Sequence, residues 1–164
     1  MREILDAIEF EYRRYKKIGE GAFAQVNDQE LAVVPAPDGN SIAIVVWHIS
    51  VNLKSRFTDF LATDGEKPWR DRESEFDART VSREALLAKW DEGWSVLFNA
   101  LSALDDDGLR RRVSIRGEEM SVLQALQRSV THASYHVGQI VMLARSFRGT
   151  EWRSLSMPRT RSAH

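Results

Sequence analysis

The chain has 164 residues and a net charge of −1 at pH 7, with 43% hydrophobic and 29% charged residues. This length and composition are typical of one soluble domain, so we expect a single domain over residues 1–164. The near-zero charge disfavours binding to nucleic acid, the absence of a long apolar segment disfavours a membrane span, and the absence of cysteine excludes disulfides and enzyme thiolates. We therefore expect a cytoplasmic protein that binds small molecules rather than nucleic acid or membrane.

Two helices are predicted in the first third of the chain. Apolar residues recur at helical spacing from 2 to 26, which predicts the first helix. Residues 27–40 contain two prolines and a glycine and are predicted to form a loop. A second helix begins near Ser41, with Asn40 or Ser41 as its N-cap, and its apolar stripe extends to Phe60.

The rest of the chain adds a crossover, two more helices and a hairpin. Residues 63–80 are polar and broken by glycine and proline, and a connection of this length is more often functional than idle. The third helix is predicted over residues 82–104, a small hairpin around residues 116–117, and the fourth helix over residues 121–147, which begins with a capping box. Residues 148–164 are predicted to be an irregular C-terminal tail.

Four amphipathic helices with little strand predict an all-α fold, a four-helix bundle. Its particular features are the long crossover between the second and third helices and the hairpin before the fourth. Because the crossover is long enough to span the bundle, the second and third helices can run parallel.

Three histidines lie in apolar helical segments. His132 and His136 are four residues apart, so both can turn a ring nitrogen toward one point, a common arrangement for two ligands of a transition metal. His48 lies in the apolar second helix, and the fourth histidine is the terminal His164. A buried imidazole without a partner costs about 1–3 kcal/mol, and one shared metal would satisfy all three. The alternative is a set of hydrogen-bonded core histidines without a metal.

Five stretches of the chain resemble the DinB-like (DinB/YfiT-like) superfamily of metal-dependent four-helix-bundle proteins. They are "NSIAIVVWHISVNLKSRFTDFL", "TDGEKPWRDRESEF", "VSIRGEEMSVLQAL", "HASYHVGQI" and "WRSLSMPR", and they span Asn40 to Arg159. The resemblance implies a bundle that often forms a dimer. It also implies a divalent metal, most often zinc or nickel, held by three histidines from the second and fourth helices, which here are His48, His132 and His136.

The same resemblance implies several chemistries. Some relatives transfer a low-molecular-weight thiol, such as bacillithiol or mycothiol, onto an electrophile, and others are hydrolases or isomerases. Three protein ligands leave a coordination position open, as in catalytic sites, and a metal there lowers the pKa of a bound water or thiol. Because the chain has no cysteine, the sulfur must come from a substrate, which favours thiol transfer over an enzyme-thiolate mechanism.

Three further residues are candidates to assist at this centre. Asn52, one turn after the histidine of the second helix, can orient a ligand or simply be polar at the bundle boundary. Arg56 can bind a carboxylate of a thiol cofactor, or pair with Asp59 or a loop acid. Gln139 can hydrogen-bond to a histidine ligand or to a neighbouring helix. No helix-borne general base is evident, so a base would have to come from elsewhere, such as the crossover acids Glu66, Asp71 and Glu73.

The sequence thus leaves three hypotheses. The first is a metal-dependent enzyme, with thiol S-transfer as the favoured reaction and hydrolysis as the next. The second is a non-catalytic, stress-associated bundle whose metal only stabilises the fold or senses metal. The third is a helical dimerisation module whose histidines are hydrogen-bonded.

Overall fold

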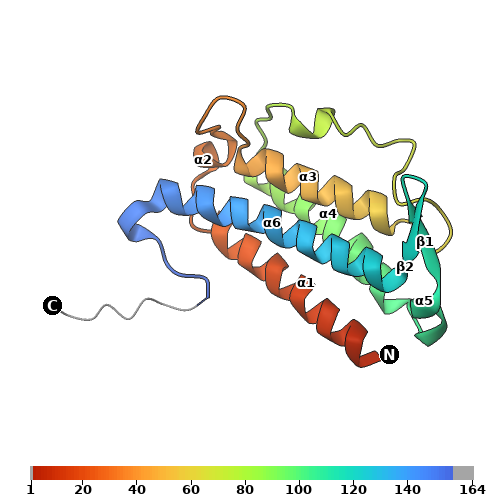
Figure 1. The fold of residues 1–164 in the computed structure, drawn as a ribbon. Coiled ribbons are helices and arrows are strands. Elements are labelled where there is room, and N and C mark those ends of the chain that lie inside the picture. The colour runs from red at the N-terminus through yellow and green to blue at the C-terminus, as the bar shows by residue number, and fades with distance from the viewer. Residues whose placement is uncertain (1, 157–164) are drawn as a thin grey trace.

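Four long helices form a bundle in the computed structural model, which describes residues 2–156 (Figure 1). They are α1 (Arg2–Phe23), α3 (Ile42–Phe57), α4 (Arg83–Ser102) and α6 (Val122–Arg148). Helices α3 and α4 run in the same direction and pack against each other, while α1 and α6 run the opposite way and also pack together (Figure 1). The all-α bundle predicted from the hydrophobic periodicity is therefore confirmed, with the crossover between α3 and α4.

Large aromatic side chains fill the space between the helices. Trp90 and Trp94 of α4 and Tyr12 of α1 are fully buried. The Tyr12 ring meets Phe57 and Trp94 edge-on, with ring centroids 6.4 and 6.2 Å apart. Its hydroxyl donates a hydrogen bond to the carbonyl oxygen of Leu126, at 3.0 Å, so one side chain joins α1 to α3, α4 and α6.

The parallel pair α3 and α4 approaches closely at Gly93. A Cβ atom added there would lie 2.5 Å from the Cα and 2.7 Å from the carbonyl oxygen of Ser50. The Ser50 hydroxyl also donates a hydrogen bond to the Lys89 carbonyl, at 2.5 Å. Only glycine fits this contact without a shift of the backbone. The contact fixes the position of α3, and with it that of His48, along α4.

A two-stranded hairpin covers one end of the bundle and is tied to the crossover. Strands β1 (Arg112–Ile115) and β2 (Glu118–Ser121) pair antiparallel, and Arg116 and Gly117 form the turn with φ of 56° and 76°. The backbone N–H groups of both turn residues donate to the carboxylate of Asp64, each at 2.9 Å. The Ser114 hydroxyl donates to the same carboxylate at 2.6 Å. The start of the crossover is thereby fixed against the hairpin.

Several predicted boundaries are wrong in detail. The first helix ends at Phe23 rather than near residue 26, and the segment predicted as a loop contains a short helix α2 (Asp28–Ala32). Asn27 and Glu30 form a capping box that starts α2, which shows that the local cap outweighs the nearby prolines. The second helix ends at Phe57, before residue 60, because Thr58 adopts an extended backbone with ψ of 126° and Asp59 follows with a left-handed φ of 47°.

The acidic run after α4 forms an element that the sequence did not predict. It begins another short helix, α5 (Asp106–Arg110), because the side chain of Asp105 caps it by accepting from the N–H of Gly108 at 2.7 Å. Beyond α6, the predicted tail opens with the 3₁₀ helix η2 (Gly149–Glu151), and residues 157–164, His164 included, lie outside the described part. Within residues 2–156, no helix has both the length and the apolar character needed to cross a membrane.

Candidate metal centre

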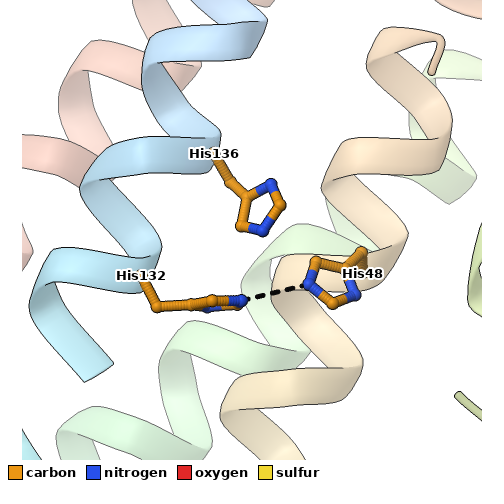
Figure 2. A group of neighbouring side chains, drawn as sticks. All are labelled: His48, His132 and His136. Atoms are coloured by element: carbon orange, nitrogen blue, oxygen red, sulfur yellow. Dashed lines mark hydrogen bonds between the residues drawn. The ribbon is translucent and has the colours of Figure 1, made fainter. Parts of the chain in front are cut away.

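Three histidines from two helices converge in the middle of the bundle. Figure 2 shows His132 and His136 pointing from successive turns of α6 toward His48 on α3. One ring nitrogen from each lies within 4.8 Å of the others, and the Nε2 atoms of His48 and His132 are 3.1 Å apart. His48 and His136 are buried and His132 is half-buried. The predicted set is thus brought together as a cluster that could hold a metal ion.

Local sequence explains why these helices present histidines there. Helix α3 begins at Ser41, whose hydroxyl accepts a hydrogen bond from the N–H of Ile44, and most of the helix is buried against its neighbours. Helix α6 begins after Ser121 with the predicted capping box, which fixes where the helix starts and so on which turns His132 and His136 lie. The predicted N-cap Ser121 is confirmed, and of the two candidates for α3 the N-cap is Ser41 rather than Asn40.

A buried carboxylate from the crossover orients His48. Glu75, in the 3₁₀ helix η1 (Ser74–Phe76), places its Oε2 atom 2.7 Å from Nδ1 of His48 and is only 2% exposed. Arg70 donates to both oxygens of this carboxylate, from Nε at 2.6 Å and from the terminal nitrogen at 2.9 Å. Because the carboxylate accepts from Nδ1, His48 keeps its proton on that nitrogen and turns the lone pair of Nε2 toward the cluster.

Sequence reasoning missed Glu75 and named its neighbours Asp71 and Glu73 instead. Both of those are exposed. The available signal was the next residue, Phe76, whose ring packs over His48 with centroids 4.7 Å apart. The segment has a second aromatic residue, Trp69, which is exposed, so an aromatic side chain alone does not single out this point.

Gln139 orients His136 as Glu75 orients His48. Its amide oxygen lies 2.8 Å from Nδ1 of His136, one turn earlier on α6. An amide oxygen only accepts, so Nδ1 of His136 donates, and Figure 2 shows the other ring nitrogen directed toward His132 and His48. Gln139 is thus the hydrogen-bond partner of a candidate ligand rather than part of the cavity wall.

The electrostatics keep these groups in the protonation states that bind metal. Burial, together with the neighbouring His136 and His48, lowers the pKa of His132 to about 3. Burial also lowers the pKa of His136, against a smaller opposing effect of Gln139. Burial acts to raise the pKa of Glu75, but hydrogen bonds from His48 and Arg70 outweigh it and hold that pKa below its usual value. At neutral pH the site therefore offers neutral imidazoles at His132 and His136 beside the ionised carboxylate of Glu75.

The donor set fits a divalent transition metal. Two nitrogens bound to zinc at ~2.0–2.1 Å with a tetrahedral angle lie roughly 3.4 Å apart, close to the 3.1 Å between His48 and His132. Imidazole suits zinc, nickel and copper, and three such ligands leave a position open. The carboxylate behind His48 matches the support that metal-binding histidines commonly receive.

A pocket of about 190 Å³ opens beside the cluster. His48 and His132 line it, and so do the candidates Asn52 and Arg56. Asn52 is buried, and Arg56 pairs with the crossover carboxylate Glu66 at 3.0 Å, the loop-acid alternative rather than Asp59. Glu66 pairs with Arg56, Arg70 and Arg116 and does not itself line the pocket.

Comparison with known proteins gives a family. A family profile described as "Protein of unknown function (DUF1572)" matches residues 1–161. The chain belongs to this family. No curated protein matches the DUF1572 chain.

Two solved structures share its fold. One is a DinB-like protein from Bacillus cereus ATCC 10987, with 20% sequence identity, a TM-score of 0.66, and coverage of 90% of this chain and 92% of the other. The other is a conserved protein from Enterococcus faecalis, with 16% identity, a TM-score of 0.62, and coverage of 88% and 94%. The DinB-like resemblance read from the sequence is thereby confirmed, and at these identities the likeness concerns the fold.

Proposed function

We propose that this DUF1572 protein is a metal-dependent enzyme that holds a divalent metal, zinc or nickel, on His48, His132 and His136. The observation that carries the proposal is a set of three imidazoles that share one centre, two of which, His48 and His132, line a pocket. A metal that only stabilises the fold needs no such pocket. A bound metal would lower the pKa of a water or thiol that reaches it.

The residues around the centre have separate tasks in this proposal. Glu75 and Gln139 hold the proton on Nδ1 of His48 and of His136, which keeps each ring turned toward the centre. Phe76 packs against the His48 ring and shields it from water. Asn52 lines the pocket one turn after His48 and can orient a substrate there.

The lining of the pocket favours a thiol co-substrate over water. None of the described residues that line it is an aspartate or glutamate, so no carboxylate stands ready to take a proton from water. A thiol ionises far more readily than water and depends less on such a base. We therefore propose thiol S-transfer, with a low-molecular-weight thiol and a small electrophile as substrates, and keep metal-dependent hydrolysis as the alternative.

Cobalt substitution tests the proposal. Co²⁺ replaces zinc in many sites and changes its visible spectrum when its ligands change. We expect 2-mercaptoethanol to alter the spectrum of the Co²⁺-loaded protein and ethylene glycol, its oxygen analogue, to leave it unchanged. A spectrum that responds to small anions but not to the thiol would refute thiol transfer and favour hydrolysis. A spectrum that responds to nothing would indicate a closed, non-catalytic site.

The homodimer implied by the DinB-like resemblance stays a prediction. Light scattering on the purified protein measures the mass directly, and a mass close to the 18.8 kDa of one chain would contradict it.

A further inference from the structure

The pocket beside the histidines is strongly basic. Five of the residues that line it are arginines, and no described lining residue is acidic. These arginines come from α3, the crossover, the hairpin turn and α6, and they are Arg56, Arg70, Arg72, Arg116 and Arg128. Arginine brought to one cavity from four segments is unusual in a chain whose net charge is only −1.

Three of the five already have carboxylate partners inside the protein. Glu66 accepts from Arg56 at 3.0 Å, from Arg116 at 3.1 Å and from Arg70 at 3.4 Å. Arg70 is further held by Glu75. Two carboxylates thus share three guanidinium groups, and they hold these groups in place at the wall of the pocket.

The other two arginines are not neutralised in this way. Arg72 is exposed and has no hydrogen-bond or ion-pair partner within residues 2–156. Arg128 is exposed, and its nearest carboxylate is Glu118 at 3.9 Å, where both side chains are more than half exposed, so the pair contributes little. Both nevertheless line the cavity. Their positive charge is available to a ligand.

The position of Arg128 ties this charge to the metal centre. Arg128 precedes His132 by four residues on α6, so it lies one turn away on the same face of the helix. Arg72 approaches from the crossover, on the segment that also carries Glu75. His48 and His132 therefore line the same pocket as Arg72 and Arg128, which are its two unneutralised cations.

We propose that the pocket binds the anionic group of a substrate, a carboxylate or a phosphate, between Arg72 and Arg128. The planar guanidinium donates two parallel hydrogen bonds to either group, and two such forks suit an oxyanion. The inference rests on the proposed function in that it places the reacting end of the same molecule at the histidines. It assigns the substrates to a class, small acids or phosphorylated compounds.

Calorimetry with simple anions tests this site without a known substrate. Malonate and inorganic phosphate are titrated at low ionic strength into chelator-treated protein, into Arg72→Ala, Arg128→Ala and the double variant, and into Arg145→Ala. Arg145 is a matched control because it is an exposed arginine on α6 that does not line the pocket. Circular dichroism checks that each variant is folded, as the exposure of these side chains leads us to expect.

We expect each single pocket variant to weaken binding of the better anion at least about tenfold, and the double variant to abolish it, while Arg145→Ala stays within about twofold of wild type. The stronger of the two probes decides between carboxylate and phosphate. Absence of binding of both anions to wild type, or equal binding by the double variant, would overturn the inference.

Zinc content of the same preparations before chelation separates this inference from the proposed function. Stoichiometric zinc without arginine-dependent anion binding would refute the anion site alone. Arginine-dependent binding in a protein that takes up no zinc would refute the metal centre and leave the anion site in place.

Discussion

Replacing Glu75 by glutamine probes the contact that the sequence did not reveal. The wild-type carboxylate accepts from His48 at 2.7 Å and from Arg70 at 2.6 and 2.9 Å, and its carboxyl group is almost completely buried. Glutamine keeps the shape but has one acceptor oxygen for both donors, and its NH₂ group then faces one of them. In one orientation His48 keeps only a neutral acceptor, and in the other it faces the NH₂ group and has no acceptor. In both orientations Arg70 loses its charged partner.

The expected effect on metal binding follows from that loss. Removing the hydrogen-bond partner of a metal-binding histidine typically lowers metal affinity by about 10–100-fold, which corresponds to roughly 1.4–2.8 kcal/mol. Stability of the metal-free protein falls as well, by about 1.5–3 kcal/mol for one lost charge-assisted hydrogen bond. Because Glu66 stays within 3.4 Å of Arg70, the buried guanidinium keeps one counter-charge, and we expect the variant to fold.

Competition with a chromogenic chelator measures the zinc affinity, and urea unfolding measures the stability. Glu73→Gln is the matched control, since it removes the same charge from the same segment at an exposed position. We expect the control to match wild type in both assays. Wild-type zinc affinity in a folded Glu75→Gln protein would refute the orienting role of the carboxylate.

Three further substitutions test the scaffold. Gly93→Ala places a methyl group against the backbone of Ser50 and should lower the free energy of unfolding, measured in urea, by about 1–3 kcal/mol. At Gly138 an added Cβ meets nothing, so Gly138→Ala should raise the free energy of unfolding by about 0.5–1 kcal/mol. Equal stability of the two variants would contradict the close approach of α3 and α4. Burial acts to raise the pKa of Asp64, but hydrogen bonds from Ser114 and from backbone N–H groups outweigh this effect and lower that pKa. The Asp64 carboxylate therefore stabilises the fold above its unfolded pKa of about 3.9, and this stabilisation is lost as pH falls through the lower folded pKa. Asp64→Asn should therefore be less stable than wild type at pH 7 and should lose less stability on acidification below about pH 4, and parallel acid-unfolding curves by circular dichroism would contradict this.

The bundle and the histidine cluster could be predicted because they depend on local spacing. Amphipathic periodicity over 20 or more residues in α4 and α6 outweighs small errors in any one position. His132 and His136 share a helix face whatever the rest of the fold does. The three-histidine set required one long-range assumption, that α3 packs against α6, and the DinB-like resemblance supplied it.

The parts that could not be predicted depend on single caps and on long-range contacts. Helices α2 and α5 have five residues each, too few to show a periodic pattern, and only Asn27 and Asp105 mark their starts. Glu75 lies 27 residues from His48 in a segment rich in acids. It becomes the partner of His48 only because the crossover folds over α3. The arginines of the pocket come from four separate segments, so no local pattern identifies them as one group.

The central claim is that His48, His132 and His136 bind one metal together, and metal stoichiometry tests it most directly. Plasma mass spectrometry on untagged wild-type protein, purified without chelator, should find about one equivalent of zinc or nickel per chain. Each of the three histidine-to-alanine variants should lose that metal, and His164→Ala, which removes the fourth histidine of the chain, should keep it. Absence of stoichiometric metal from wild type, or its retention in any of the three cluster variants, would contradict a shared three-histidine centre.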